Sequence, residues 1–84
     1  MMNEVQREIS IIAYINWNKF GGSMSYTKLR EELNARGLHS NPNNRGLGRQ
    51  IATAYDRAIQ EKNQGIADCI ANYFTNDAGK RLKR

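Results

Sequence analysis

Residues 43–57 carry the side chains of this sequence that are best suited to recognition by hydrogen bonding. Arginine can donate two hydrogen bonds to guanine, asparagine and glutamine can pair with adenine in the same bidentate way, and threonine can contact the thymine methyl group. The set consists of Asn43, Asn44, Arg45, Arg49, Gln50, Thr53 and Arg57. These residue types predict a surface that contacts phosphates and base edges, so duplex DNA is the expected ligand.

The spacing of apolar residues predicts a helix that positions most of this set. Apolar side chains recur with a helical period between 47 and 59, which favours an amphipathic helix from near Asn44 to near Lys62. At 100° per residue, the side opposite the apolar stripe holds Arg49, Thr53, Asp56 and Gln60, and the shoulders hold Arg45, Gly46, Gln50 and Arg57. Any helix that packs on a core has a polar outer face, and the Asp56 carboxylate would repel phosphates. A purely solvated surface is therefore the alternative interpretation.

The loop before this helix adds donors for an anion. Residues 43–49 combine two asparagines, two arginines and the unpaired backbone N–H groups of a helix N-terminus, which together suit a phosphate. Gly46 and Gly48 do not form a nucleotide-binding motif, because a third glycine, a preceding strand and a following Lys-Ser or Lys-Thr pair are missing. The alternative is that these glycines only let the loop enter the helix tightly.

Residues that could carry out catalysis are scarce. Cys69 and His39 are the only residues of their types and lie thirty positions apart. Cys69 falls on the apolar stripe of a predicted helix, where a core role is expected. One Cys and one His at this spacing do not make a metal site, and the adjacent Glu31 and Glu32 point to different sectors of solvent. We therefore expect no enzyme activity, no metal and no cofactor.

The net charge of +5 is concentrated in the second half of the 84 residues. Residues 1–37 have five Lys and Arg against four carboxylates, whereas residues 38–84 have eight against four. The chain ends in a basic tail over 80–84 that contains Lys80, Arg81, Lys83 and Arg84, and these cations would add phosphate affinity with a steep salt dependence. A basic balance that serves solubility alone is the alternative.

Length and apolar content indicate a single small domain over 1–84 with a modest core. No apolar run is long enough for a signal peptide or a membrane span, and a single cysteine excludes an internal disulfide. We expect a cytoplasmic protein of the bacterial or phage type, with no membrane partner.

Three further helices are predicted, from about Asn3 to Asn18, from a cap at Ser25 or Thr27 to Arg36, and over 66–74. The expected fold is mainly α, a compact bundle of about four short helices. The first helix is apolar most of the way round, because Ile11, Tyr14, Ile15 and Trp17 lie outside its main stripe. Either this helix is the central core element, or its second face pairs with another copy in a homodimer.

Two arrangements are open beyond the fourth helix. Residues 76–79 have the signature of a turn, and residues 73–75 and 80–82 would then be the strands of a small β-hairpin. In the other arrangement, a helix over 66–74 is followed by a frayed basic tail. The spacing of three and four favours the helix for 66–74 and leaves the hairpin open after it.

The segment Leu29-Arg30-Glu31-Glu32-Leu33-Asn34-Ala35-Arg36-Gly37-Leu38, followed by a polar loop and a helix, resembles the first half of a helix-turn-helix. It is similar to that of winged-helix regulators and of the DNA-binding part of serine-type site-specific recombinases. The resemblance covers about residues 26–60 and implies that the helix after the loop is the recognition helix. The link over 38–44 is longer than in the tight form of the motif and has no aromatic residue, so the resemblance favours the winged form.

Two functions of different classes follow. The first is a small DNA-binding protein without enzyme activity, such as a transcriptional or phage or plasmid regulator. The second is a protein-interaction module, such as a small phage or plasmid accessory factor or inhibitor, that docks through its first helix. Exposed Tyr14 and Trp17 would favour a protein partner, and burial of both would favour DNA.

Overall fold

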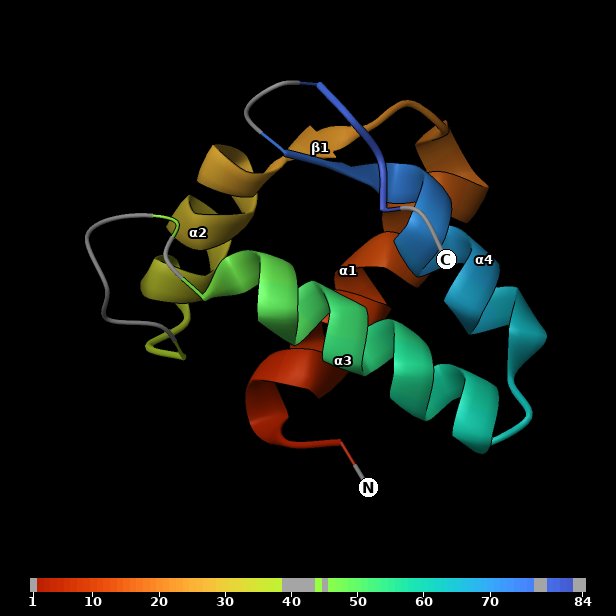
Figure 1. The fold of residues 1–84 in the computed structure, drawn as a ribbon. Helices are drawn as coiled ribbons and strands as arrows, with labels where there is room; N and C mark the ends of the chain where they lie inside the picture. The colour runs from red at the N-terminus through yellow and green to blue at the C-terminus, as the bar shows by residue number, and fades with distance from the viewer. Residues whose placement is uncertain (1, 39–43, 45, 77–78, 83–84) are drawn as a thin grey trace.

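Four helices and two short strands form the part of the chain that the structure, a computed structural model, describes: residues 2–38, 44, 46–76 and 79–82. In chain order the elements are α1 (Glu4–Phe20), β1 (Met24–Ser25), α2 (Tyr26–Ala35), α3 (Leu47–Gln60), α4 (Gln64–Tyr73) and β2 (Phe74–Thr75). The expected mainly α fold with about four short helices is confirmed (Figure 1).

The ends of α1 and α2 follow from local sequence. The Asn3 side chain accepts a hydrogen bond from the backbone N–H of Gln6, and the Gln6 side chain accepts one from the backbone N–H of Asn3, which forms a capping box. Ser25 caps α2 by accepting from the N–H of Lys28. At the other end of α2, Gly37 has φ +70°, and the N–H of Leu38 donates to the carbonyl of Leu33 at 3.0 Å.

Several predicted boundaries need correction. The third helix begins at Leu47 and not near Asn44, because Gly46 has φ +84° and therefore cannot be part of a right-handed helix. The fourth helix begins at Gln64, earlier than predicted, because Asn63 caps it by accepting from the N–H of Ile66. The first helix continues to Phe20, where the N–H of Gly21 bonds the carbonyls of Asn16 and Trp17.

The core lies where α1, α3 and α4 meet, and α2 covers one end of it. Its largest fully buried side chains are Ile9, Leu29, Leu33, Leu47, Ile51, Ile70 and Phe74. Figure 1 shows α3 crossing in front of α1, and α4 lies beside these two helices and contacts both. No helix within the described ranges is both long enough and apolar enough to cross a membrane. The packing buries the inner side of α3, and Arg49, Asp56 and Gln60 on its opposite side are exposed.

The chain closes through a small sheet that the sequence pattern does not predict. β1 and β2 pair in parallel, with Met24 opposite Phe74 and Ser25 opposite Thr75. Thr75 also forms an antiparallel bridge with Arg81, and the N–H of Asn76 donates to the carbonyl of Lys80 at 2.9 Å. Of the hairpin predicted after the fourth helix, one antiparallel bridge is therefore present, between Thr75 and Arg81. Tyr73 remains in α4 and does not belong to a strand.

Candidate nucleic-acid interface

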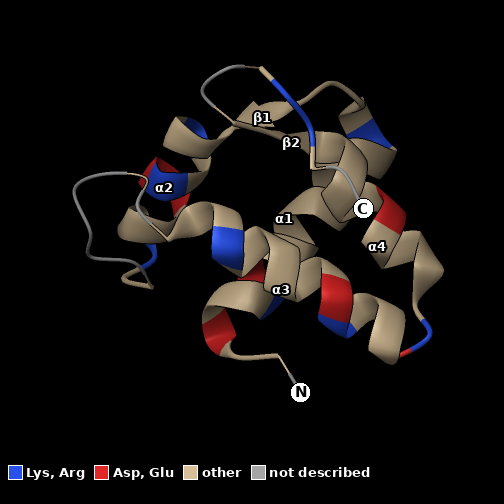
Figure 2. Cartoon of the chain, in the orientation of Figure 1, with Lys and Arg blue, Asp and Glu red and all other residues tan. Residues whose placement is uncertain are grey.

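The outward side of α3 is the surface that the sequence predicts to meet a polyanion. It carries Arg49, Thr53, Asp56 and Gln60, of which Thr53 is half-buried and the other three are exposed. Figure 2 shows cationic and acidic positions along α3, with no other helix lying over the outward side. Within residues 2–38, 44, 46–76 and 79–82, the Arg49 side chain makes no hydrogen bond or ion pair. Its guanidinium can therefore meet a phosphate or a base edge without first breaking an internal contact.

Two other predicted residues of α3 point toward its flanks. Arg57 is half-buried, and its Nη1 donates to Oε1 of Gln60 at 3.0 Å. Gln50 is also half-buried, and its Oε1 accepts a hydrogen bond of 3.0 Å from Nε2 of Gln6 in α1. Arg57 keeps its charge next to the outward side, whereas Gln50 is engaged at the contact between two helices.

Three ion pairs join described residues, and they lie on α1 and α2. Glu32 pairs with Lys28 at 3.7 Å and with Arg36 at 3.6 Å, and Arg36 also pairs with Glu8. These pairs are partly exposed and contribute little to stability individually. Arg49 and Arg57 form none of these ion pairs, and with Asp56 they give α3 two positive charges against one negative charge.

The start of α3 is fixed by Asn44. Its Nδ2 donates to Oγ1 of Thr27 at 3.1 Å, and its Oδ1 accepts from Nη1 of Arg30 at 3.2 Å. Its backbone carbonyl accepts from the N–H of Leu47. Asn44 thus joins the link to α2, and no side chain caps α3 at Gly46. The predicted Asn43 and Arg45, together with His39, lie outside the described residues.

Arg30 is a residue of this region that sequence reasoning did not select. Its contact with Asn44 joins positions fourteen apart, and no periodic signal connects a helix surface to a residue in a following irregular link. The cationic character and half-buried position of Arg30 place a further positive charge near the start of α3. This side chain therefore belongs with the candidate site.

The basic end of the chain is held beside β2 over the residues that the structure describes. Lys80 and Arg81 are exposed, the N–H of Lys80 donates to Oδ1 of Asn76, and Leu82 packs against the core. Figure 2 shows these cations next to the small sheet and not on α3. Residues 80–82 are consequently anchored and are not a frayed tail. Lys83 and Arg84 lie outside the described residues.

The exposure of the α1 aromatics favours neither function alone. Tyr14 is 51% exposed, whereas Trp17 is half-buried and packs against the core. α1 is therefore a central core element through Ile9, Ile12 and Ala13 and also keeps an uncovered apolar side. The structure thus places α1 in the core, and the pairing of its second face with another copy stays a prediction.

Cys69 is a core residue, as predicted, with 5% of its surface exposed. Burial, with the charge of the neighbouring Asp68, raises the pKa of the Cys69 thiol, and a hydrogen bond from Asn18 opposes the shift in part. A raised pKa keeps the sulfur in its weakly nucleophilic thiol form. No three His, Cys, Asp or Glu side chains of the described ranges are grouped so that they could hold a metal ion.

Comparison with known proteins adds no relative to this description. No protein-family model matches the chain, and neither a curated protein nor a solved structure shows a significant match to it.

Proposed function

We propose that this protein binds duplex DNA without catalysing a reaction and that the outward side of α3 is its recognition surface. The main support for this proposal is the position of Arg49. It lies exposed on a helix side that no described element covers, and it has no carboxylate partner among the described residues. Arg49 and Thr53 would contact base edges in the major groove, and Arg57 would contact a phosphate beside them.

The arrangement of α2 and α3 supports a helix-turn-helix-like pair. Both helices pack on α1, and the contacts of Asn44 with Thr27 and Arg30 attach the link between them to α2. In such a pair the second helix enters the groove with its N-terminal residues leading. Arg49 lies in the first turn of α3, in agreement with that geometry.

The small sheet supports a basic edge like that of a winged form, in a modified topology. Arg81 lies on the strand-like segment that bridges to Thr75, and Lys80 precedes it. The topology is modified in two ways: α4 follows α3 in the chain and precedes β2, and β2 pairs in parallel with β1. In the proposal, the DNA backbone is contacted by Lys80 and Arg81 and also by Asn43, Asn44, Arg45, Lys83 and Arg84. Gln50 has a different role, because it holds α3 against α1.

The test is binding to duplex and single-stranded DNA at several salt concentrations, starting from about 50 mM. Arg49→Ala should weaken duplex binding about tenfold, and Arg57→Ala should lower the salt slope by about one. The matched control is Lys62→Gln, which removes one positive charge beyond the end of α3 and should change binding little. Circular dichroism should show unchanged helix content in all three variants. No measurable duplex binding by the parent protein would refute the proposal.

A protein-interaction module is the second candidate, and the exposed α1 residues favour it. Ile15 and Tyr14 are each 51% exposed on one helix, more than a surface helix needs. Affinity capture from a nuclease-treated lysate tests this candidate. A protein retained by the parent chain and lost with Tyr14→Asp would support it, and retention of nucleic acid alone would support DNA binding.

A further inference from the structure

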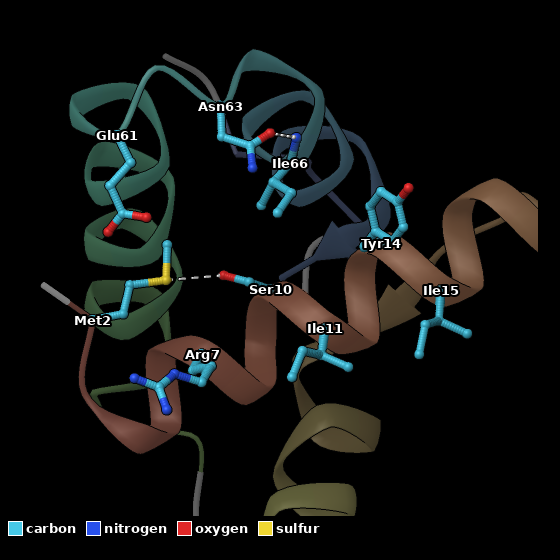
Figure 3. A pocket seen from close by; sticks show the side chains of 9 residues that line it. All are labelled: Met2, Arg7, Ser10, Ile11, Tyr14, Ile15, Glu61, Asn63 and Ile66. Atoms are coloured by element: carbon cyan, nitrogen blue, oxygen red, sulfur yellow. Dashed lines mark hydrogen bonds between the residues drawn. The ribbon is translucent and has the colours of Figure 1, made fainter.

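The outward side of α1 carries an apolar stripe next to a groove. Ile11 is 42% exposed, and Tyr14 and Ile15 are 51% exposed. The groove has a volume of about 660 Å³ and runs between α1 and the turn that joins α3 to α4. Figure 3 shows Ile11 and Ile15 projecting from the same side of α1, with Arg7 one turn before them and Glu61 across the groove.

We propose that this side of α1 binds the same side of a second copy, with the two helices antiparallel about a two-fold axis at Ile11. The exposed positions have the period of a helix-pairing seam. Glu4, Ile11 and Asn18 are seven residues apart, and so are Arg7 and Tyr14. A seven-residue spacing keeps one stripe facing a partner helix along its length. Ile11 is the midpoint of this stripe, which places it opposite its own copy.

The charged residues at the edges of the stripe favour a second copy of the chain, in the antiparallel direction, as the partner of α1. The two-fold axis places Glu4 opposite the partner's Lys19 at one edge of the seam. At the other edge, Arg7 lies opposite the partner's Tyr14, where a guanidinium can lie over an aromatic ring. A parallel pair would instead place Glu4 against Glu4 and Arg7 against Arg7, and these like charges would repel.

Of the charged residues on this side of α1, Glu8 pairs with Arg36, whereas Glu4 and Arg7 form no ion pair with a described residue. The side chains of Glu4 and Arg7 also make no hydrogen bond to a described residue, and Lys19 lies 5.5 Å from the ring centroid of its neighbour Phe20. The face therefore carries both signs of charge at positions that match after a two-fold rotation. A uniformly acidic or basic partner would match only part of it.

The size of the face sets the strength of the dimer. α1 has 17 residues, so the seam is about 25 Å long and belongs to the small class of interfaces, below about 1,200 Å² in total. We therefore expect a reversible dimer whose population depends on protein concentration. This dimer does not require DNA, so its test is separate from that of the proposed function.

The experiment is sedimentation velocity on the protein without nucleic acid, from about 5 to about 500 μM, where mass action favours a weak dimer. The parent should shift from monomer toward dimer over this range. Ile11→Glu should abolish the shift. The matched control is Ile59→Glu, which adds the same charge at an isoleucine of α3 with 41% exposure and should leave the dimer intact.

A charge exchange tests the antiparallel register and does not depend on the Ile11 variant folding. Glu4→Lys and Lys19→Glu should each weaken the dimer severalfold, and the double variant should recover most of the loss. A monomeric parent over the whole range would overturn the proposal. A dimer that survives Ile11→Glu in a folded protein, or a double variant weaker than both single variants, would also overturn it.

Discussion

Gln6 of α1 donates a side-chain hydrogen bond of 3.0 Å to Gln50 of α3, between residues 44 positions apart. Gln6 is buried and also belongs to the capping box at the start of α1. The same residue therefore takes part in the cap at the start of α1 and in the contact of α1 with α3. Gln50, which the sequence places among base-reading residues, is held at this crossing.

We expect Gln50→Ala to affect stability more than DNA binding. The substitution leaves the buried amide of Gln6 without its acceptor, which should lower the free energy of unfolding by about 1 kcal/mol. Gln60→Ala, at an exposed position of the same helix, should lower it by less than about 0.5 kcal/mol. Urea denaturation measures both values. Equal effects of the two substitutions would show that the bond to Gln6 contributes nothing.

Asp56→Asn should strengthen duplex binding. Asp56 lies exposed on the outward side of α3, and its negative charge opposes phosphates there. Removing it should raise the affinity about threefold at low salt, and the gain should shrink as salt screens the charge. Asp68→Asn, the same change at an exposed position of α4, is the control. If both substitutions give the same gain, net charge and not the α3 surface explains it.

Two glycines at the start of α3 should respond in opposite directions to alanine. At Gly48 an added Cβ would lie 3.6 Å from Cε2 of Tyr26, an ordinary contact, so Gly48→Ala should stabilise the protein by about 0.5–1 kcal/mol. At Gly46 the φ of +84° disfavours any Cβ, so Gly46→Ala should destabilise it by about 1–2 kcal/mol. Thermal unfolding followed by circular dichroism compares them. The same sign for both would contradict a start of α3 at Leu47 with Gly46 in left-handed backbone.

Alkaline pH should weaken the fold through Tyr73 and Cys69. Burial, with the charge of Glu32, raises the pKa of Tyr73, and burial with the charge of Asp68 raises that of Cys69. A raised pKa means that the folded state holds the proton more tightly. This contribution is complete below the unfolded values of about 8.5 for Cys and about 10 for Tyr, and it is lost as pH rises from those values through the folded ones.

Urea denaturation between neutral pH and about pH 10.5 measures that loss. Tyr73→Phe keeps the ring and removes the titrating hydroxyl, so its stability should fall less steeply above about pH 9.5 than that of the parent. Parallel curves for the two proteins would show that Tyr73 does not contribute to the alkaline loss.

The helices were predictable because each buries one side with a regular period. Leu47, Ile51, Ala54 and Ala58 lie in the core as the spacing requires. The predicted start of α3 was too early because glycine adopts positive and negative φ about equally well, so Gly46 alone does not indicate which of the two the chain takes. The pairing of Met24–Ser25 with Phe74–Thr75 was not predictable, since two-residue strands have no period and their partners lie fifty residues apart.

For the candidate site, the sequence predicts which side of α3 faces outward. The helical wheel correctly places Arg49 and Gln60 opposite the buried stripe. It gives no information on which shoulder residue a neighbouring helix will engage, so Gln50 and its bond to Gln6 were missed. The attachment of Asn44 to α2 was missed for the same reason, because it depends on where α2 lies in space.

The parallel pairing of β1 with β2 affects how the protein is synthesised. Phe74 is fully buried, and the strand that it begins is the partner of a segment made fifty residues earlier. While residues up to 73 emerge from the ribosome, the apolar sides of the preceding helices lack this aromatic ring. We therefore expect the core to be completed only after residue 75 has left the exit tunnel, and a nascent chain stalled before that point to expose apolar surface.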